Sequence, residues 1–270
     1  MNKRLIPLAI VGAIVLFLLA FVLVPAMSRK QEERSSYGGF LGKMSVDEND
    51  IIVPEGMTLD SSSPIETSPP PDPIFTPMPG EFTELLVDDF SDPEVGLEIT
   101  PVHQSGFTAK YYDDGFTMYI QEPMVTGYVT KELITNNMVI DVTTTYTAGT
   151  ESNFYGLVTR YTDNENFYYF MISNTGYYSI GKKVDGETTT LLPAETMQTS
   201  TINTSRGETN HILVMCDGNQ FFLYVNDELI SSVEDSTLEG YGFGFAVISG
   251  NEKGTSVSFD DVTIYGFERN

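Results

Sequence analysis

The chain has 270 residues, 41% of them hydrophobic, with 38 acidic and 14 basic side chains and a formal net charge of −24. Residues 81–270 alone hold 29 acidic and 8 basic side chains, a net charge of −21, so the acidity is not confined to a tail. A phosphate-binding surface needs clustered Lys and Arg. Nucleic acid is therefore excluded as a partner, and the same field repels anionic lipid and sulfated glycans.

Residues 5–27 form an almost unbroken apolar run between basic pairs at 3–4 and 29–30. About 20 apolar residues cross a bilayer as a helix, whereas a signal peptide usually has an apolar region of about 7 to 15. The run favours a retained transmembrane signal anchor that contacts the lipid bilayer, although the small residues at 24–26 leave a cleaved signal peptide open. After a short tail at 1–4, we expect a single-pass cell-membrane protein with its C-terminal domain outside the cytoplasm. Basic residues on both sides mean that the positive-inside rule does not decide the orientation.

Residues 28–81 hold eight of the fourteen prolines, mixed with Ser and Thr. Proline removes a backbone donor and biases its predecessor toward extended conformations, which excludes a helix or a central strand. The composition predicts a flexible, Pro-rich stalk that spaces a domain from the membrane, at about 3.1 Å per residue in polyproline II. A docking peptide for a proline-binding domain is the alternative reading.

Residues 82–270 read as one folded, all-β domain of a size that suits a single sandwich. Short runs with β-branched and aromatic residues recur between Asn, Asp and Gly turns, and no amphipathic helical period is present. We expect strands at 82–90, 116–120, 138–146, 154–162, 167–173, 177–183, 211–216, 220–225, 229–233, 241–249 and 256–267. The most economical arrangement is a two-sheet antiparallel sandwich.

Seven short motifs follow one another along this domain: VDDFSDP (87–93), DGF (114–116), FYGLVTRY (154–161), FYYF (167–170), GYYSI (176–180), LYVN (223–226) and FDDVTIY (259–265). In this order they resemble the concanavalin A-like, laminin G-like jelly-roll superfamily. The resemblance implies a jelly roll whose closing strand pairs beside its opening strand. It also implies a fold used to bind glycans or proteins, in some branches to hydrolyse glycosides, and often for structural display.

The sequence offers little for catalysis. The carboxylate signature of glycosidases of this fold, Glu-x-Asp-x-x-Glu on a strand, is absent, and pairs such as Asp163/Glu165 fall in turns. His103 and His211 form no metal-ligand spacing. The lone Cys216 follows an apolar run and is expected to be a small buried hydrophobe. We therefore expect a protein that is not an enzyme.

Two aspartate pairs are candidates for a structural Ca²⁺ site. Hard cations prefer carboxylate oxygens, and the resemblance implies that the pairs at the two ends of the domain approach each other. The predicted ligands are Asp88, Asp89, Asp260 and Asp261. The alternative is that these acids only solvate the surface.

Tyrosines gather in the central strands, and adjacent tyrosines of one strand point to opposite faces of the sheet. One member of each pair is expected in the core and its neighbour on a ligand-facing or solvent surface. The predicted ligand-binding residues are Tyr155, Tyr168, Tyr178 and Arg160. Arg160 is the only arginine of this aromatic region, although it could simply pair with an acid.

The favoured function is a membrane-tethered, noncatalytic binding module for a neutral glycan or a cell-surface protein. The alternatives are a structural envelope protein that binds no small ligand, and a divergent glycoside hydrolase.

Overall fold

The computed structural model describes residues 82–97, 99, 102–104, 106–112, 115–133, 135, 137–149 and 152–268. The expected tail, transmembrane segment and stalk lie outside these residues. No helix within the described ranges is long and apolar enough to cross a membrane.

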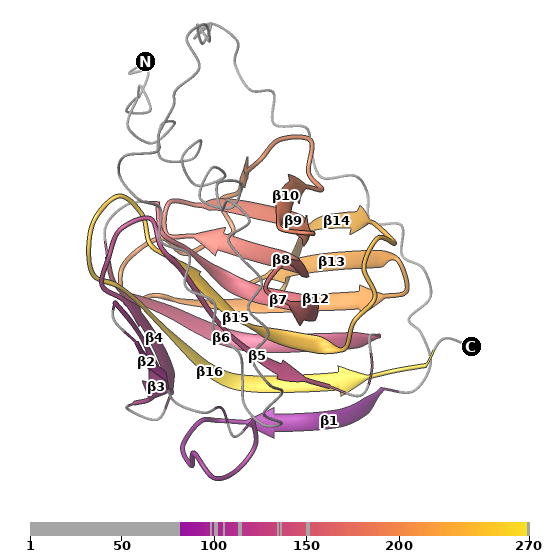
Figure 1. The fold of residues 1–270 in the computed structure, drawn as a ribbon, viewed down its shortest axis with the longest axis horizontal. Helices are drawn as coiled ribbons and strands as arrows, with labels where there is room; N and C mark the ends of the chain where they lie inside the picture. Colours follow the sequence, from indigo (N-terminus) through magenta and orange to yellow (C-terminus); the bar gives the residue numbers. More distant parts are fainter. Residues whose placement is uncertain are drawn as a thin grey trace, which may run out of the picture.

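Sixteen strands in the described residues form two antiparallel sheets of nine and seven strands, stacked as two layers (Figure 1). The nine-stranded sheet contains β1 (Thr83–Asp88), β2 (Val102–Gln104), β3 (Phe107–Tyr111), β4 (Phe116–Ile120), β6 (Met138–Ala148), β12 (Thr209–Asp217), β13 (Gln220–Val225), β14 (Glu228–Glu234) and β16 (Thr255–Gly266). The seven-stranded sheet contains β5 (Thr126–Glu132), β7 (Phe154–Asp163), β8 (Asn166–Ser173), β9 (Tyr177–Val184), β10 (Glu187–Thr190), β11 (Met197–Gln198) and β15 (Gly242–Ile248).

The order of the strands in each sheet is that of a jelly roll. The larger sheet runs β14-β13-β12-β6-β16-β4-β3-β2 with β1 also on β16, and the smaller runs β10-β9-β8-β7-β15-β5 with β11 on β9. The opening strand pairs with the closing strand, with Asp88 beside Val262. The predicted all-β, two-sheet sandwich and its terminal strand pairing are therefore confirmed.

Five strands were not expected from the sequence. β2, β10 and β11 are two to four residues long, too short for a period to register. β5 contains Gly127, which lowers strand propensity, and only its register against β15 fixes it in the sheet. β3 pairs with β4 as the first strand of a hairpin.

Burial differs between the two sheets. In the nine-stranded sheet, β13 and β16 alternate between buried and partly exposed residues, the pattern of a sheet with one solvated face. The central strands β7, β8 and β15 of the smaller sheet are buried along both faces. The main core lies between the sheets, where Phe245 stacks on Phe259 with ring centroids 4.6 Å apart.

Candidate functional site

The tyrosines predicted to face a ligand point into the sandwich. Tyr155, Tyr168 and Tyr178 belong to the core between the sheets, where Tyr155 accepts a hydrogen bond from Asn210 and Tyr178 donates one to the Ile230 carbonyl. The alternation of neighbours is confirmed, because Tyr169 and Tyr177 lie on the opposite face. The assignment of faces is corrected: the three chosen rings fill the interior and do not form a platform for a ligand.

Arg160 is also an interior residue, placed there by a β-bulge. Its φ is +47°, and the pairing of β7 with β8 shifts register beyond Thr159. The side chain is 3% exposed, and the guanidinium lies 4.7 Å from the ring centroid of Phe221. It donates to the carbonyl oxygens of Gly218 and of Leu238, the latter at 3.3 Å. No carboxylate of the described residues lies within ion-pair distance of Arg160. Its partners are backbone carbonyls, neither the predicted ligand nor the acid of the alternative reading.

Tyr168 is part of a network around Asp235 at the same end of the sandwich. One oxygen of Asp235 accepts the Tyr168 hydroxyl at 2.6 Å and the Thr237 N–H at 2.9 Å, and the other accepts Lys182 at 2.6 Å. Burial acts to raise the pKa of Asp235, but the hydrogen bonds from Lys182, Tyr168 and Thr237 outweigh it and hold that pKa well below its usual value. Burial raises the pKa of Tyr168 to about 12. Asp235 is therefore a carboxylate that fixes Lys182.

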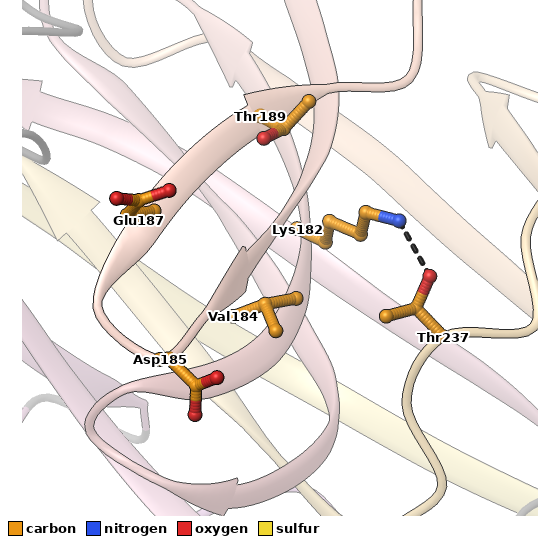
Figure 2. A pocket seen from close by; sticks show the side chains of 6 residues that line it. All are labelled: Lys182, Val184, Asp185, Glu187, Thr189 and Thr237. Atoms are coloured by element: carbon orange, nitrogen blue, oxygen red, sulfur yellow. Dashed lines mark hydrogen bonds between the residues drawn. The ribbon is translucent and has the colours of Figure 1, made fainter.

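The network forms one wall of an open depression at the rim of the sandwich, between the β9–β10 hairpin and the β14–β15 connection (Figure 2). We call it the rim depression; its volume is about 470 Å³. It is lined by Lys182, Val184, Asp185, Glu187, Thr189 and Thr237. Figure 2 shows the Lys182 side chain reaching across to Thr237, whose hydroxyl oxygen is 2.5 Å from the ammonium nitrogen.

The rim depression offers hydrogen-bonding groups of both kinds. An ammonium has three N–H donors, and two of those on Lys182 are used by Asp235 and Thr237. The exposed carboxylates of Asp185 and Glu187 have no hydrogen-bond or ion-pair partner in the described part of the chain. The same depression is thus lined by one fixed cation, directed at Thr237, and by two carboxylates without a partner among the described residues. Charge-assisted hydrogen bonds to hydroxyl groups are the chemistry that this set supports.

Three of the four aspartates predicted to bind calcium accept hydrogen bonds from neighbouring groups of the chain. Both oxygens of Asp88 accept backbone N–H groups, from Phe90 at 2.8 Å and from Leu97 at 2.7 Å. Asp89 accepts from Ser91, and Asp260 accepts the N–H of Asp261. The described residues contain no group of three or more Asp, Glu, His or Cys side chains that could hold a metal ion. The two carboxylate oxygens of Asp88 therefore fix the loop after β1.

The remaining candidates lie on strands of the nine-stranded sheet. Cys216 is fully buried in β12, as expected, and burial raises the pKa of its thiol to about 11. His211 lies between the carboxylates of Asp141 and Asp227, with its two ring nitrogens in contact with them. His103 lies in β2.

Sequence reasoning missed the residues of the rim depression. In the sequence, Lys182 stands out only as part of the basic pair Lys182-Lys183. Its partner Asp235 is 53 residues away along the chain, so no local pattern connects the two. The turn at Asp185 and Glu187 joins two strands, of which β10 was not expected. The available signal was the sequence Asp185-Gly186-Glu187, which closely follows the basic pair Lys182-Lys183.

No family model and no curated protein matches the sequence. Among solved structures, the chain is similar to a Bacillus subtilis protein of unknown function with a galectin-like fold, at 8% identity and a TM-score of 0.52 over 72% of this chain and 100% of that one. It is similar to the laminarinase catalytic domain of Thermotoga maritima, at 8% identity and 0.52 over 70% and 100%. A Clostridium perfringens endo-β-galactosidase that releases GlcNAcα1-4Gal matches at 10% identity and 0.50 over 69% and 64%. The described domain therefore has the concanavalin A-like jelly-roll fold.

Proposed function

We propose that this domain is a noncatalytic glycan-binding module whose ligand site is the rim depression. The observation that supports the proposal is that one depression is lined by a fixed ammonium, Lys182, and by the carboxylates of Asp185 and Glu187, which have no partner among the described residues. Neighbouring hydroxyl groups of a sugar can donate to the carboxylates while a ring or hydroxyl oxygen accepts from Lys182. Because Lys182 is held by Asp235 and Thr237, little side-chain entropy is lost on binding.

Charge selects the class of glycan. Residues 81–270 have a net charge of −21, and two carboxylates line the depression itself. This field disfavours sulfated and other anionic sugars, so the ligand is a neutral glycan. Two of the similar structures are named as enzymes that act on glycans. At 8% and 10% identity, this similarity supports only the fold of the domain.

The site binds and does not hydrolyse. Hydrolysis needs an acid and a nucleophile or base facing each other across one bond. Asp185 lies in the turn with Gly186, and Glu187 is the first residue of β10. We further propose that the module is displayed outside the cytoplasm on the stalk at 28–81, tethered to the cell membrane by residues 5–27.

The test is a glycan array probed with the full chain in detergent. The proposal predicts binding to at least one neutral glycan, no binding to sulfated ones, and no release of reducing sugar from the bound glycan. Absence of binding to every neutral glycan would favour a scaffold protein that has no small ligand. Turnover of a bound glycan, abolished by a single acid substitution, would favour a divergent hydrolase.

The same preparation tests the calcium prediction at Asp88, Asp89, Asp260 and Asp261. A ligand that binds only the folded state raises the melting temperature. A rise on adding Ca²⁺ that a chelator reverses would support that site, and an unchanged midpoint would remove it.

A further inference from the structure

The outer face of the β3–β4 hairpin carries two exposed tyrosine rings. Tyr112 is 61% exposed and Tyr119 is 39% exposed. Along both strands every second residue belongs to the core between the sheets, so the residues between them face outward. The outward residues beside Tyr119 are Thr108, Lys110 and Thr117. We call these three residues and the two tyrosines the tyrosine strip.

The pairing of the hairpin separates the two tyrosines along the tyrosine strip. Tyr119 lies opposite Thr108, and Tyr112 follows Thr108 by four positions, which is about 13 Å at about 3.4 Å per residue. Lys110 lies between them, opposite Thr117, and its ammonium nitrogen is 4.9 Å from the centroid of the Tyr112 ring. The strip is therefore an extended surface with a ring at each end and a hydrogen-bond donor between them.

Hydroxyl groups accompany the rings. In the neighbouring strand β16, Ser256 pairs with Tyr119 and Ser258 pairs with Thr117. The side-chain hydroxyls of Thr108, Thr117 and Ser258 have no hydrogen-bond partner in the part of the chain that the structure describes. A hydroxyl both donates and accepts, so these groups can satisfy a ligand that carries donors and acceptors in equal measure.

Charge distinguishes the tyrosine strip from the rest of the domain. Residues 81–270 have a net charge of −21. The outward residues of β3, of β4 and of the part of β16 that pairs with β4 include one lysine and no acid. The field of the whole domain disfavours an anionic ligand, and the local ammonium disfavours a cationic one. The strip therefore suits a neutral ligand.

We propose that the tyrosine strip binds a neutral, linear glycan chain as a second site. The C–H groups of a sugar ring pack on the face of an aromatic ring, while its hydroxyl groups exchange hydrogen bonds with Thr and Ser side chains. Positions about 13 Å apart contact different sugar units of one extended chain. β3 lies between β2 and β4, and β4 lies between β3 and β16, so the backbone of the strip is fixed before a ligand binds.

This site is separate from the rim depression. The tyrosine strip belongs to the nine-stranded sheet, whereas the rim depression is built on the β9–β10 hairpin of the seven-stranded sheet (Figure 1). No residue of the strip lines the depression. The two sites can therefore be removed one at a time.

Two other occupants fit less well. A second copy of the chain would bring together two domains that each have a net charge of −21. A proline-rich peptide would pack on the rings, but it offers mainly carbonyl acceptors, since proline has no N–H. The acceptor oxygens of Thr108, Thr117 and Ser258 would then be left without donors. A glycan supplies both kinds of group.

The experiment measures how affinity depends on the length of the glycan. The full chain in detergent micelles is titrated by calorimetry with mono- to hexasaccharides of a linear glucan, a mannan, a galactan and a xylan. The wild type is compared with Tyr112→Ala combined with Tyr119→Ala. The matched control is Tyr241→Ala, which removes a ring that is 57% exposed elsewhere on the domain. A variant with phenylalanine at both positions of the strip keeps the rings, and thermal melts verify that every variant is folded.

We expect the affinity of the wild type for at least one series to rise at least about tenfold from the disaccharide to the hexasaccharide, because only the longer chain reaches both rings. This rise should disappear in the double alanine variant and persist in the phenylalanine variant and in Tyr241→Ala. It should also persist in Asp185→Asn with Glu187→Gln, so failure of the rim depression is told apart from failure of the strip.

Three results would overturn the proposal. The first is the absence of a rise with length in the wild type for all four series. The second is a rise that survives in the double alanine variant. The third is binding of a proline decamer in place of every glycan, which would favour a peptide partner.

Discussion

The guanidinium of Arg160 donates to the carbonyl oxygen of Leu238 at 3.3 Å, across 78 positions of the chain. The N–H of the same Leu238 donates to the Tyr168 hydroxyl at 3.0 Å. Two residues of the seven-stranded sheet thereby hold the β14–β15 connection. Arg160 binds the backbone carbonyl of Leu238, and Tyr168 binds the backbone N–H of the same residue. This connection carries Thr237, so Arg160 and Tyr168 position the rim depression without lining it.

Replacing Arg160 by methionine is expected to destabilise the domain by about 3 kcal/mol. The substitution keeps much of the packing on Phe221 but leaves the carbonyls of Gly218 and Leu238 without their donor, at about 1 to 3 kcal/mol for each unsatisfied group. Urea unfolding measures the change. The matched control is Lys253→Met, which removes an exposed ion pair with Glu122 and should cost less than about 1 kcal/mol. Equal losses in the two variants would contradict the role given to Arg160.

The ion pair between Asp235 and Lys182 predicts a pH dependence of stability. Because the folded state lowers the pKa of Asp235, the carboxylate stabilises the fold at pH values above its unfolded pKa and loses this effect as the pH falls. The wild type should melt above Asp235→Asn at neutral pH, and the gap should shrink below about pH 4. Thermal melts across this range measure the gap. A gap that stays constant down to about pH 2 would show that the charge of Asp235 is not its source.

Replacing Gly156 by alanine is expected to destabilise the domain, because there is no space for a Cβ at this position. A Cβ at this position would lie 2.1 Å from the carbonyl oxygen of Phe170, which belongs to the backbone of β8 and cannot rotate away. Gly207 has a φ of +84° but open space around it, so Gly207→Ala isolates the cost of an unfavourable φ, about 1 to 2 kcal/mol. Gly156→Ala should lose clearly more stability than Gly207→Ala in the same denaturant series. Similar losses would mean that the strands separate easily.

Cys216 is predicted to be chemically silent in the folded protein. Its thiol is fully buried, and burial raises its pKa to about 11, so the reactive thiolate is scarce at about pH 8. A disulfide-exchange reagent should label the native chain only at the rate of unfolding and label the urea-unfolded chain at once. Rapid labelling of the native chain would show that β12 opens locally.

The sequence predicts the sandwich well because its signals are local. Alternation along β6, β12 and β13 and the Asn and Gly turns between strands can be read from neighbouring residues. The period of two also predicts that Tyr168 and Tyr169 face opposite ways. It does not say which ring faces inward, because both faces of β8 are buried and no polar residue marks the outer one.

The site was not predictable in the same way. Lys182 and Asp235 meet across 53 positions, and the bulge that turns Arg160 inward depends on the pairing of β7 with β8. No periodicity encodes either contact. The predicted ligand residues Arg160 and Tyr168 do lie beside the rim depression, but as its supports.

The most direct test of the proposed function is the affinity of the full chain for the neutral glycan that binds best on the array, measured by calorimetry. The variant Asp185→Asn with Glu187→Gln removes the two free carboxylates of the rim depression. Its control, Glu84→Gln with Glu252→Gln, removes two exposed charges elsewhere. The proposal predicts a loss of at least about tenfold, or 1.4 kcal/mol, in the first variant and less than about twofold in the control. Unchanged affinity in the first variant, or equal losses in both, would contradict binding in the rim depression.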